Sequence, residues 1–442
     1  MEDNKRNTLR KLMITAPSSN TGKTLISTAL IKLFKELDLE VMGAKTGPDY
    51  IDAEYLTYAS GKKSENFDLF LMDEDLIRSK INKIAAKNDV LLVEGVMGYF
   101  DGSGNTFEAS SFDLSKKLDI GAILLYEPKG EMFTMVPKIK GMVDFSEGQI
   151  KGVIFNKTSK KIYDMIAPQI EKYVGISALG YIPRDRRLEI HERSLGLIRP
   201  KEVEDIDERL NIITNQMKQT VDIRGVLMAA TQQTSEQDKI QENPFKKYKI
   251  LMANDDAFCF HYDSELYDAA TFFSPLEDKE IPADTDLVVI GGGYPELFRY
   301  QLSKNESMMN SLREYHRKGG RIIAYGGGLI YLSKRIGEVP MVGIFPGLSS
   351  MTKNLIHFGY QKAVIEDEWL GTQRGEFNAR EYHRGIYETS SRSMLTLSKP
   401  SDETGETRHS DGYKERNAYG SYSHAHPDAI SKMILQFLER KI

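Results

Sequence analysis

A phosphate-loop pattern near the amino terminus constrains this chain more than any other feature. Residues 16–24 read Ala-Pro-Ser-Ser-Asn-Thr-Gly-Lys-Thr and directly follow the apolar run Leu12–Ile14. A turn from a strand into a helix aims backbone N–H groups at an anion, and the helix dipole adds positive charge there. Lys23 in such a turn reaches the terminal phosphates, and the Thr24 hydroxyl ligates Mg²⁺. The residues expected to hold a nucleoside triphosphate are Asn20, Thr21, Gly22, Lys23 and Thr24.

The segment after the loop has the apolar period of a helix, near 3.6 residues. The residues expected on its buried face are Leu25, Ile26, Ala29, Leu30, Leu33, Phe34 and Leu37. The usual pattern has a glycine five residues before Gly22, where this chain has Pro17. The alternative to a nucleotide site is that residues 16–24 form an ordinary strand-to-helix turn.

Length and composition indicate a soluble protein of two or three domains. The chain has 442 residues, 40% of them hydrophobic and 28% charged, as is usual for globular proteins. A net charge of -5 gives no reason to expect a nucleic acid or an anionic membrane as partner. One cysteine, no signal-like amino terminus and no membrane-length apolar run favour a cytoplasmic location.

Apolar strands alternate with helical segments twice along the chain, which predicts an α/β fold with parallel sheets. The expected strands are Leu12–Ile14, Val41–Ala44, Val90–Val93, Ala122–Leu125, Gly152–Phe155, Ile250–Ala253, Leu287–Ile290 and Ile322–Ala324. A polar stretch between the two series is typical of a linker. We therefore expect a first domain over 1–228, a linker over 229–247 and a second domain over 248–442.

Two acidic segments follow expected strands in the first domain. Asp49 lies in Lys-Thr-Gly-Pro-Asp-Tyr-Ile-Asp (45–52), and Glu94 lies in Val-Glu-Gly-Val-Met-Gly-Tyr-Phe-Asp-Gly (93–102). Ligands of parallel sheets bind beyond the carboxyl ends of the strands, and Mg²⁺ prefers hard oxygen ligands. Thr24, Asp49 and Glu94 are therefore the expected metal ligands.

These two segments resemble signature segments of the cobyrinic acid a,c-diamide synthase family, and those of the similar Ni-sirohydrochlorin a,c-diamide synthases. Pro17 is similar to what that family carries. Further stretches that resemble the family are residues 156–157, 180–185, 191–197, 258–262 and 291–297. The resemblance therefore covers essentially the whole chain.

The resemblance implies a dethiobiotin-synthetase-like ATP domain joined to a class I glutamine amidotransferase-like domain. It implies ATP- and Mg²⁺-dependent amidation of the a and c acetate groups of a corrinoid or related tetrapyrrole, through acyl phosphates, in cobalamin biosynthesis. The roles it implies are phosphate and metal binding by Lys23 and Thr24, metal or phosphate-proximal roles for Asp49 and Glu94, substrate handling and intermediate release by Tyr50 and Asp101, and adenine contact by Asn156.

The second domain lacks the nucleophile of a glutaminase. Where family members resemble Ala-Glu-Cys-Gly-Gly, this chain has Ala-Tyr-Gly-Gly-Gly, so Gly326 replaces the cysteine. His424 resembles the general base, and without a thiol we interpret it as a relic or a hydrogen-bonding residue. Cys259 is expected to be a packed residue, and His383 to be structural or substrate-facing. We therefore expect free ammonia, or ammonia from a separate glutaminase, to serve as nitrogen source.

Several alternatives stay open at this point. The substrate can be a cobalt corrinoid, a metal-free corrinoid or nickel sirohydrochlorin. The chain can also be a non-catalytic tetrapyrrole-binding paralogue, or a related ligase that acts on another carboxylate. The second domain can help cover the tetrapyrrole or form a homodimer interface.

Overall fold

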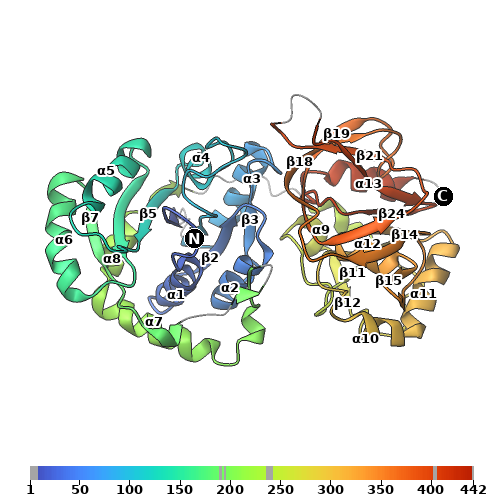
Figure 1. Cartoon of the computed structure of the whole chain (residues 1–442), viewed down its shortest axis with the longest axis horizontal. Coiled ribbons are helices and arrows are strands. Elements are labelled where there is room, and N and C mark those ends of the chain that lie inside the picture. Colours follow the sequence, from blue (N-terminus) through green and yellow to red (C-terminus); the bar gives the residue numbers. More distant parts are fainter. Residues whose placement is uncertain (1–7, 189–191, 194–195, 235–241, 402–405, 441–442) are drawn as a thin grey trace, which may run out of the picture. The chain divides into compact units, whose positions relative to one another are not determined.

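The chain forms two compact units, residues 1–69 with 73–240 and residues 70–72 with 241–442 (Figure 1). The computed structural model describes residues 8–188, 192–193, 196–234, 242–401 and 406–440. Residues 191, 194 and 195 of the motif at 191–197, and residues 235–241 of the expected linker, lie outside the described residues. No helix among the described residues is both long and apolar enough to cross a bilayer.

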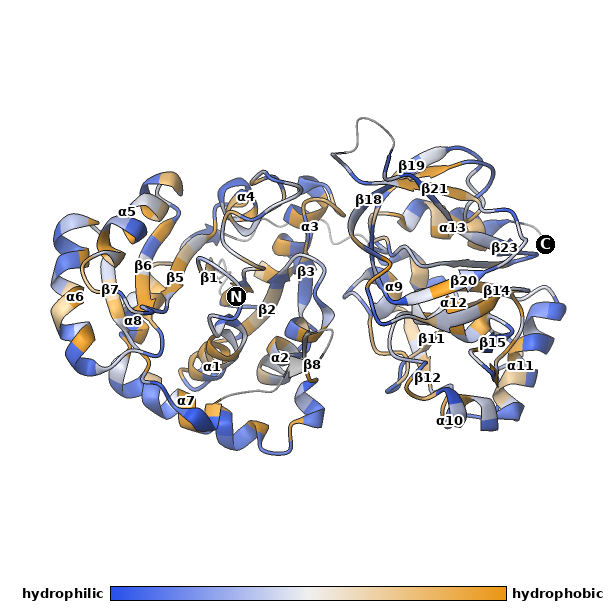
Figure 2. Ribbon diagram, viewed as in Figure 1, coloured by the Kyte–Doolittle hydropathy of each residue, from blue (hydrophilic) through white to orange (hydrophobic). Residues whose placement is uncertain are grey.

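The first unit is built on one largely parallel sheet. Its strands lie in the order β3-β2-β4-β1-β5-β6-β7, and every neighbouring pair on this path is parallel. β4 (Val90–Glu94) and β5 (Gly121–Tyr126) are buried along their whole length, as expected of a sheet covered on both faces. Figure 2 shows β2 and β5 in apolar colours and α7 with many polar positions. The five strands expected in this half are confirmed.

The remaining elements of the first unit that position the site are β1 (Thr8–Thr15), α1 (Lys23–Lys35), β2 (Val41–Thr46), α2 (Tyr50–Ser60), β3 (Glu65–Phe67), α3 (Glu74–Ala85), α4 (Ser111–Lys117), α5 (Met135–Phe145), β6 (Ile150–Phe155), α6 (Lys160–Tyr173), β7 (Ser177–Tyr181), α7 (Ile206–Thr220) and α8 (Ile223–Met228).

The apolar face predicted after the phosphate loop is the buried face of α1. Ile26, Leu30 and Phe34 are each at most 1% exposed. The prediction is wrong for Leu37, which is 53% exposed. The helix ends at Lys35, so the helical period no longer carries a side chain at position 37 back to the sheet.

Part of the stretch expected to be a linker is a strand. β10 (Thr231–Thr234) pairs antiparallel with β1, from Thr8 opposite Thr234 to Lys11 opposite Thr231. It satisfies backbone groups of β1 ahead of the point where β5 begins to pair, at Leu12. Its side chains are half-buried or exposed, so a polar sequence is compatible with a strand here.

The second unit has a six-stranded sheet in the order β12-β11-β13-β14-β24-β23, parallel except for β23. The three strands expected in this half are β11 (Ile250–Ala253), β13 (Leu287–Ile290) and β14 (Arg321–Tyr325), and they are confirmed. Two further four-stranded sheets follow, β16-β15-β17-β20 and β19-β18-β21-β22. Sequence reasoning missed these strands, because many of their side chains are exposed and dilute the apolar signal.

The other elements of the second unit are η3 (Pro244–Lys247), α9 (Glu265–Asp268), β12 (Ala270–Phe273), α10 (Arg299–Lys304), α11 (Glu306–Arg317), α12 (Gly327–Leu332), β15 (Arg335–Ile336), β16 (Val339–Pro340), β17 (Leu348–Met351), β18 (His357–Ile365), β19 (Gly375–His383), β20 (Gly385–Glu388), β21 (Leu395–Ser398), β22 (His409–Asp411), β23 (Tyr413–Glu415), β24 (Ala418–Ser421) and α13 (Ser431–Glu439).

Candidate functional site

The phosphate loop joins β1 to α1 at the carboxyl edge of the first sheet. Gly22 caps the helix in a left-handed conformation, with φ of 89°. A Cβ at this position would lie 2.8 Å from the Asn156 side-chain nitrogen, so only glycine fits both the dihedral and the space. The first turn of α1 carries no acidic residue. The loop therefore presents an uncompensated helix N-terminus, as an anion site requires.

Lys23 ties the phosphate loop to the loop after β4. Its Nζ donates to the carbonyl oxygens of Ser18 (3.0 Å) and Met97 (2.7 Å). The side chain is buried, and burial together with the nearby charge of Lys45 lowers its pKa to about 8. Neutral carbonyls are weak partners for an ammonium compared with phosphate oxygens, so an incoming anion has a favourable partner here.

Glu94 lies at the centre of the site and is fully buried. Its Oε1 accepts from the Thr24 hydroxyl (2.7 Å) and from Lys45 Nζ (2.9 Å), and Lys45 also pairs with Asp52 at 2.7 Å. Burial raises the pKa of Glu94 more than Lys45 and Thr24 lower it. The pKa of Lys45 lies above its usual value, because Asp52 and Glu94 outweigh the effect of its burial.

The other predicted residues of the synthetase half lie in or near the same place. The Asp49 carboxylate caps α2 by accepting from the backbone N–H groups of Ile51 (2.9 Å) and Asp52 (3.0 Å), and Asp49 lines the cavity. Tyr50, the first residue of α2, is 6% exposed. Asp101 accepts from the backbone N–H of Gly98 at 2.9 Å and so shapes the loop after β4. Their proposed roles stay predictions.

A cavity of about 470 Å³ opens over Lys23, Thr24, Asp49 and Glu94, within the roughly 300–1,000 Å³ usual for ligand pockets. Tyr50 and Asp101 are not among its lining residues. Asn156 lines it and donates from Nδ2 to the Thr21 carbonyl oxygen at 2.7 Å. Its Oδ1 accepts from the Lys157 backbone N–H at 2.9 Å. The predicted adenine-contacting residue thus also supports the phosphate loop. The cavity continues along residues 182–185.

Sequence reasoning named Lys45 and Asp52 in their segment but gave them no role. The structure makes them the direct partners of Glu94 and of each other. A signal was present, because Lys45 is the one charged residue of β2, whose residues are all buried. A lysine in such a strand needs a buried carboxylate partner.

The residues at the carboxyl end of β4 fit a hard divalent cation. Glu94 Oε2 is buried and has no hydrogen-bond partner among the described residues. The Thr24 hydroxyl donates to the other oxygen of the same carboxylate, Oε1. An orphaned carboxylate oxygen beside a hydroxyl is a donor set suited to Mg²⁺, which also takes oxygens from nucleotide phosphates.

The second unit holds the turn at which the family resemblance places a glutaminase cysteine. β14 ends at Tyr325, α12 begins at Gly327, and Gly326 between them has φ of 57° and ψ of -113°. A Cβ at Gly326 would lie 2.5 Å from His424 Nε2. The predicted pair, Gly326 and His424, therefore does come together, with the imidazole in the space that a cysteine side chain would need.

His424 is poorly suited to activate a thiol. Burial, and then the charges of Arg380 and His383, lower its pKa to about 3. Its backbone is fixed by two hydrogen bonds with Arg380, each 2.9 Å long, and its ring packs on Tyr325. The ring is thus neutral at physiological pH, and a base this weak has little affinity for the proton of a thiol. Cys259 is buried, as expected.

Comparison with known proteins agrees with both halves. Residues 12–197 match the family model of the CobQ/CobB/MinD/ParA nucleotide binding domain, and residues 249–431 match that of the CobB/CobQ-like glutamine amidotransferase domain. A cobyrinate a,c-diamide synthase of Clostridium tetani is 35% identical over 428 residues, 94% of this chain and 96% of that protein. Those of Listeria monocytogenes (34% identity, 95% and 96% covered) and Streptococcus sanguinis (32%, 98% and 99%) are similar.

The chain belongs to the cobyrinate a,c-diamide synthase family. The predicted family, its ligase class and its α/β architecture with an amidotransferase-like second domain are thereby confirmed. The nucleotide-binding match of residues 12–197 contains the phosphate loop, the Asp49 segment and the Glu94 segment. Gly326 lies inside the amidotransferase match, at the turn after β14.

The lowered pKa of Lys23 predicts that nucleotide affinity falls as pH rises. Phosphate favours the ammonium form, so binding above pH 8 must first return a proton to Lys23. We expect the Kd of a non-hydrolysable ATP analogue to rise about tenfold from pH 7 to pH 9 in calorimetric titrations. Lys23→Arg stays charged at both pH values and should lose this dependence. An equal wild-type Kd at both pH values would contradict the account.

The His424 contact predicts that Gly326→Cys does not create a working glutaminase. The added side chain must displace a half-buried ring whose backbone is fixed by hydrogen bonds, at a cost of about 1–3 kcal/mol. Gly337→Cys is the matched control, since Gly337 has φ of 58° and no described atom within 4 Å of an added Cβ. Both substitutions place a side chain on a backbone with positive φ. Under reducing conditions Gly326→Cys should lower the melting temperature further than Gly337→Cys does. Glutamine hydrolysis by a fully stable Gly326→Cys protein would overturn the prediction.

Proposed function

We propose that this protein uses ATP to amidate the a and c acetate carboxylates of cobyrinic acid and takes its nitrogen from ammonia. The substrate is inferred from the curated relatives, which carry the name cobyrinate a,c-diamide synthase and align over 94–98% of this chain. The observation that carries the proposal is the cavity in which Lys23, Thr24 and Glu94 lie together.

The chemistry requires that a carboxylate first be activated. Its carbonyl carbon is electron-rich and its oxygen leaves poorly, so ammonia does not attack it. Attack by the carboxylate oxygen on the γ-phosphorus of ATP releases ADP and forms an acyl phosphate. Ammonia then adds to the carbonyl carbon, phosphate departs, and an amide results. The protein contributes positioning and charge neutralisation.

The residues of the cavity divide this work in our proposal. Lys23 leaves the carbonyls of Ser18 and Met97 and pairs with the phosphates, where its charge stabilises the transferring group. Thr24 and Glu94 hold Mg²⁺, with Asp49 as a further candidate ligand, and the ion neutralises phosphate charge when bound. Lys45 and Asp52 keep Glu94 in place. Tyr50 and Asp101 handle the tetrapyrrole, and Asn156 contacts the adenine.

Two features of the second unit support ammonia as the nitrogen source in this proposal. Gly326 has no side chain to attack the amide of glutamine, and the neutral ring of His424 occupies the adjacent space. We therefore propose that this unit is a retained scaffold, and that free ammonia or a separate glutaminase supplies the nitrogen.

The test is an assay of ADP release and amide formation on cobyrinic acid, with nickel sirohydrochlorin as the alternative substrate. Ammonium should support turnover, and glutamine without a second protein should not. Lys23→Ala should lower kcat by at least about 100-fold, as for other residues that stabilise developing charge. Lys35→Ala is the matched control, since Lys35 lies on the same helix and also donates to backbone carbonyls, those of Ala59 and Ser60.

Each outcome decides one part of the proposal. Undiminished amide yield with Lys23→Ala would overturn the role of the phosphate loop. Equal rates with glutamine and ammonium would overturn the loss of the glutaminase. Binding of tetrapyrrole without any ATP turnover would favour a non-catalytic paralogue.

A further inference from the structure

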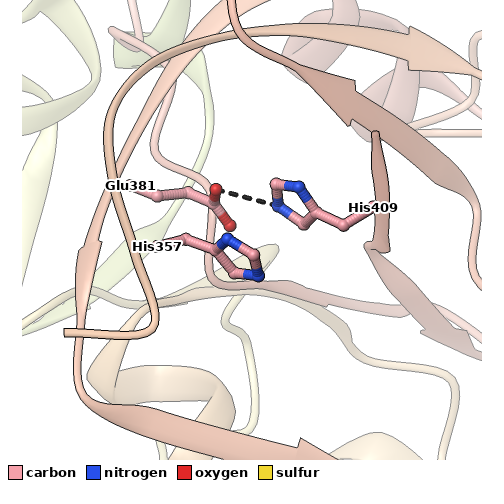
Figure 3. A group of neighbouring side chains, drawn as sticks. All are labelled: His357, Glu381 and His409. Carbon is pink, nitrogen blue, oxygen red and sulfur yellow. Dashed lines mark hydrogen bonds and ion pairs between the residues drawn. The ribbon is translucent and has the colours of Figure 1, made fainter. Parts of the chain in front are cut away.

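A cluster of three histidines surrounds one buried carboxylate in the second unit. Glu381 on β19 is 1% exposed, and His357 on β18 and His409 on β22 lie beside it (Figure 3). The rings of His357 and His409 stack with centroids 3.8 Å apart and an angle of 6° between their planes. His383, at the end of β19, approaches the same carboxylate. None of these four residues lies in the phosphate loop or in the turn at Gly326.

Each ring nitrogen of His409 faces an oxygen atom that can accept a hydrogen bond. Its Nδ1 lies 3.3 Å from the Thr407 carbonyl oxygen, and its Nε2 lies 2.9 Å from Glu381 Oε2. A neutral imidazole has only one N–H, so it cannot donate to both oxygens. The ring must therefore carry a second proton or place a cation between Nε2 and the carboxylate.

His383 repeats this arrangement on the other oxygen of Glu381. Its Nδ1 lies 2.8 Å from the Gly385 carbonyl oxygen, which accepts a hydrogen bond from the ring and leaves Nε2 facing Glu381. That Nε2 lies 3.6 Å from Glu381 Oε1, too far for a hydrogen bond. Imidazoles fixed through Nδ1 by a backbone carbonyl, with Nε2 turned toward a carboxylate, are the usual surroundings of a bound metal ion.

The charges around Glu381 also favour a cation. The Glu381 carboxylate is 1% exposed, and its two oxygens face His409 Nε2 at 2.9 Å and His383 Nε2 at 3.6 Å. A buried anion faced by imidazole lone pairs is incompletely balanced unless a positive charge is present.

We propose that His357, Glu381 and His409 bind one divalent transition-metal ion of the Zn²⁺ type, through two imidazole nitrogens and one carboxylate oxygen. The three candidate ligand atoms lie within 4.8 Å of one another. Around a tetrahedral zinc they would lie roughly 3.5 Å apart, and the His357 and His409 rings would have to rotate out of their stack so that both lone pairs point at the ion. This ligand set disfavours Mg²⁺ and Ca²⁺, which prefer oxygens alone. The ion would link β18, β19 and β22 and leave a fourth position for water.

The competing explanation is a plain ion pair, in which a protonated His409 alone balances Glu381. The two explanations differ in stoichiometric metal uptake and in the role of His357, which an ion pair does not need. The proposal concerns residues that the amidation chemistry does not use, so it stands or falls independently of the proposed function.

The test is calorimetric titration of the untagged, chelator-treated full chain with Zn²⁺, in the presence of excess Mg²⁺ and a non-hydrolysable ATP analogue that occupy the phosphate-loop site. We expect one Zn²⁺ per chain and a raised melting temperature. Glu381→Gln and His357→Ala should each raise the Kd at least about tenfold. His316→Ala is the matched control, because His316 is also hydrogen-bonded to a backbone carbonyl, that of Glu415, and is not a ligand.

Substitution of Co²⁺ gives a second readout, since visible absorption bands report coordination by nitrogen and oxygen ligands. If Glu381→Gln fails to fold, His357→Ala, which removes a half-buried ring, still gives the affinity comparison. Zinc uptake no greater than background, or an affinity unchanged by His357→Ala, would overturn the proposal in favour of the ion pair.

Discussion

One buried carboxylate, that of Glu94, organises the synthetase half. It ends β4, contacts the Thr24 hydroxyl at the start of α1 and pairs with Lys45 at the end of β2, so three neighbouring elements of the sheet edge meet on one oxygen. Removing one partner of a buried pair typically costs about 3–5 kcal/mol, because the remaining charge is left unpaired. This arrangement holds the phosphate loop and its flanking segments in register before any ligand arrives.

At one backbone position of the second unit, Gly326, a neighbouring side chain restricts which residue can fit. The turn after β14 retains the strained dihedrals that expose a nucleophile, but Gly326 occupies it and the His424 ring has the adjoining space. The sheet and the turn do not need a cysteine to form, since their packing depends on apolar residues elsewhere. The fold of an amidotransferase therefore does not by itself indicate amidotransfer.

Sequence reasoning was most successful where one periodicity or motif determined the structure. The eight apolar runs were strands, and the loop at 16–24 lay between β1 and α1. It was less successful where contacts between residues far apart in the sequence determine the structure. Lys45 acquires its role only when β2 and β4 become neighbours, and β10 is a strand only because β1 has backbone groups to pair. The histidines around Glu381 lie on three strands, at positions 357, 383 and 409, so no local sequence pattern predicts that they come together.

The central claim is that ATP activates the carboxylate by transferring a phosphoryl group to it. Cobyrinic acid labelled with ¹⁸O in its a and c carboxylates tests this directly, with ammonium as nitrogen source and mass analysis of the released phosphate. An acyl phosphate predicts one ¹⁸O in inorganic phosphate for each amide formed. Unlabelled phosphate accompanying full diamide formation would contradict the account.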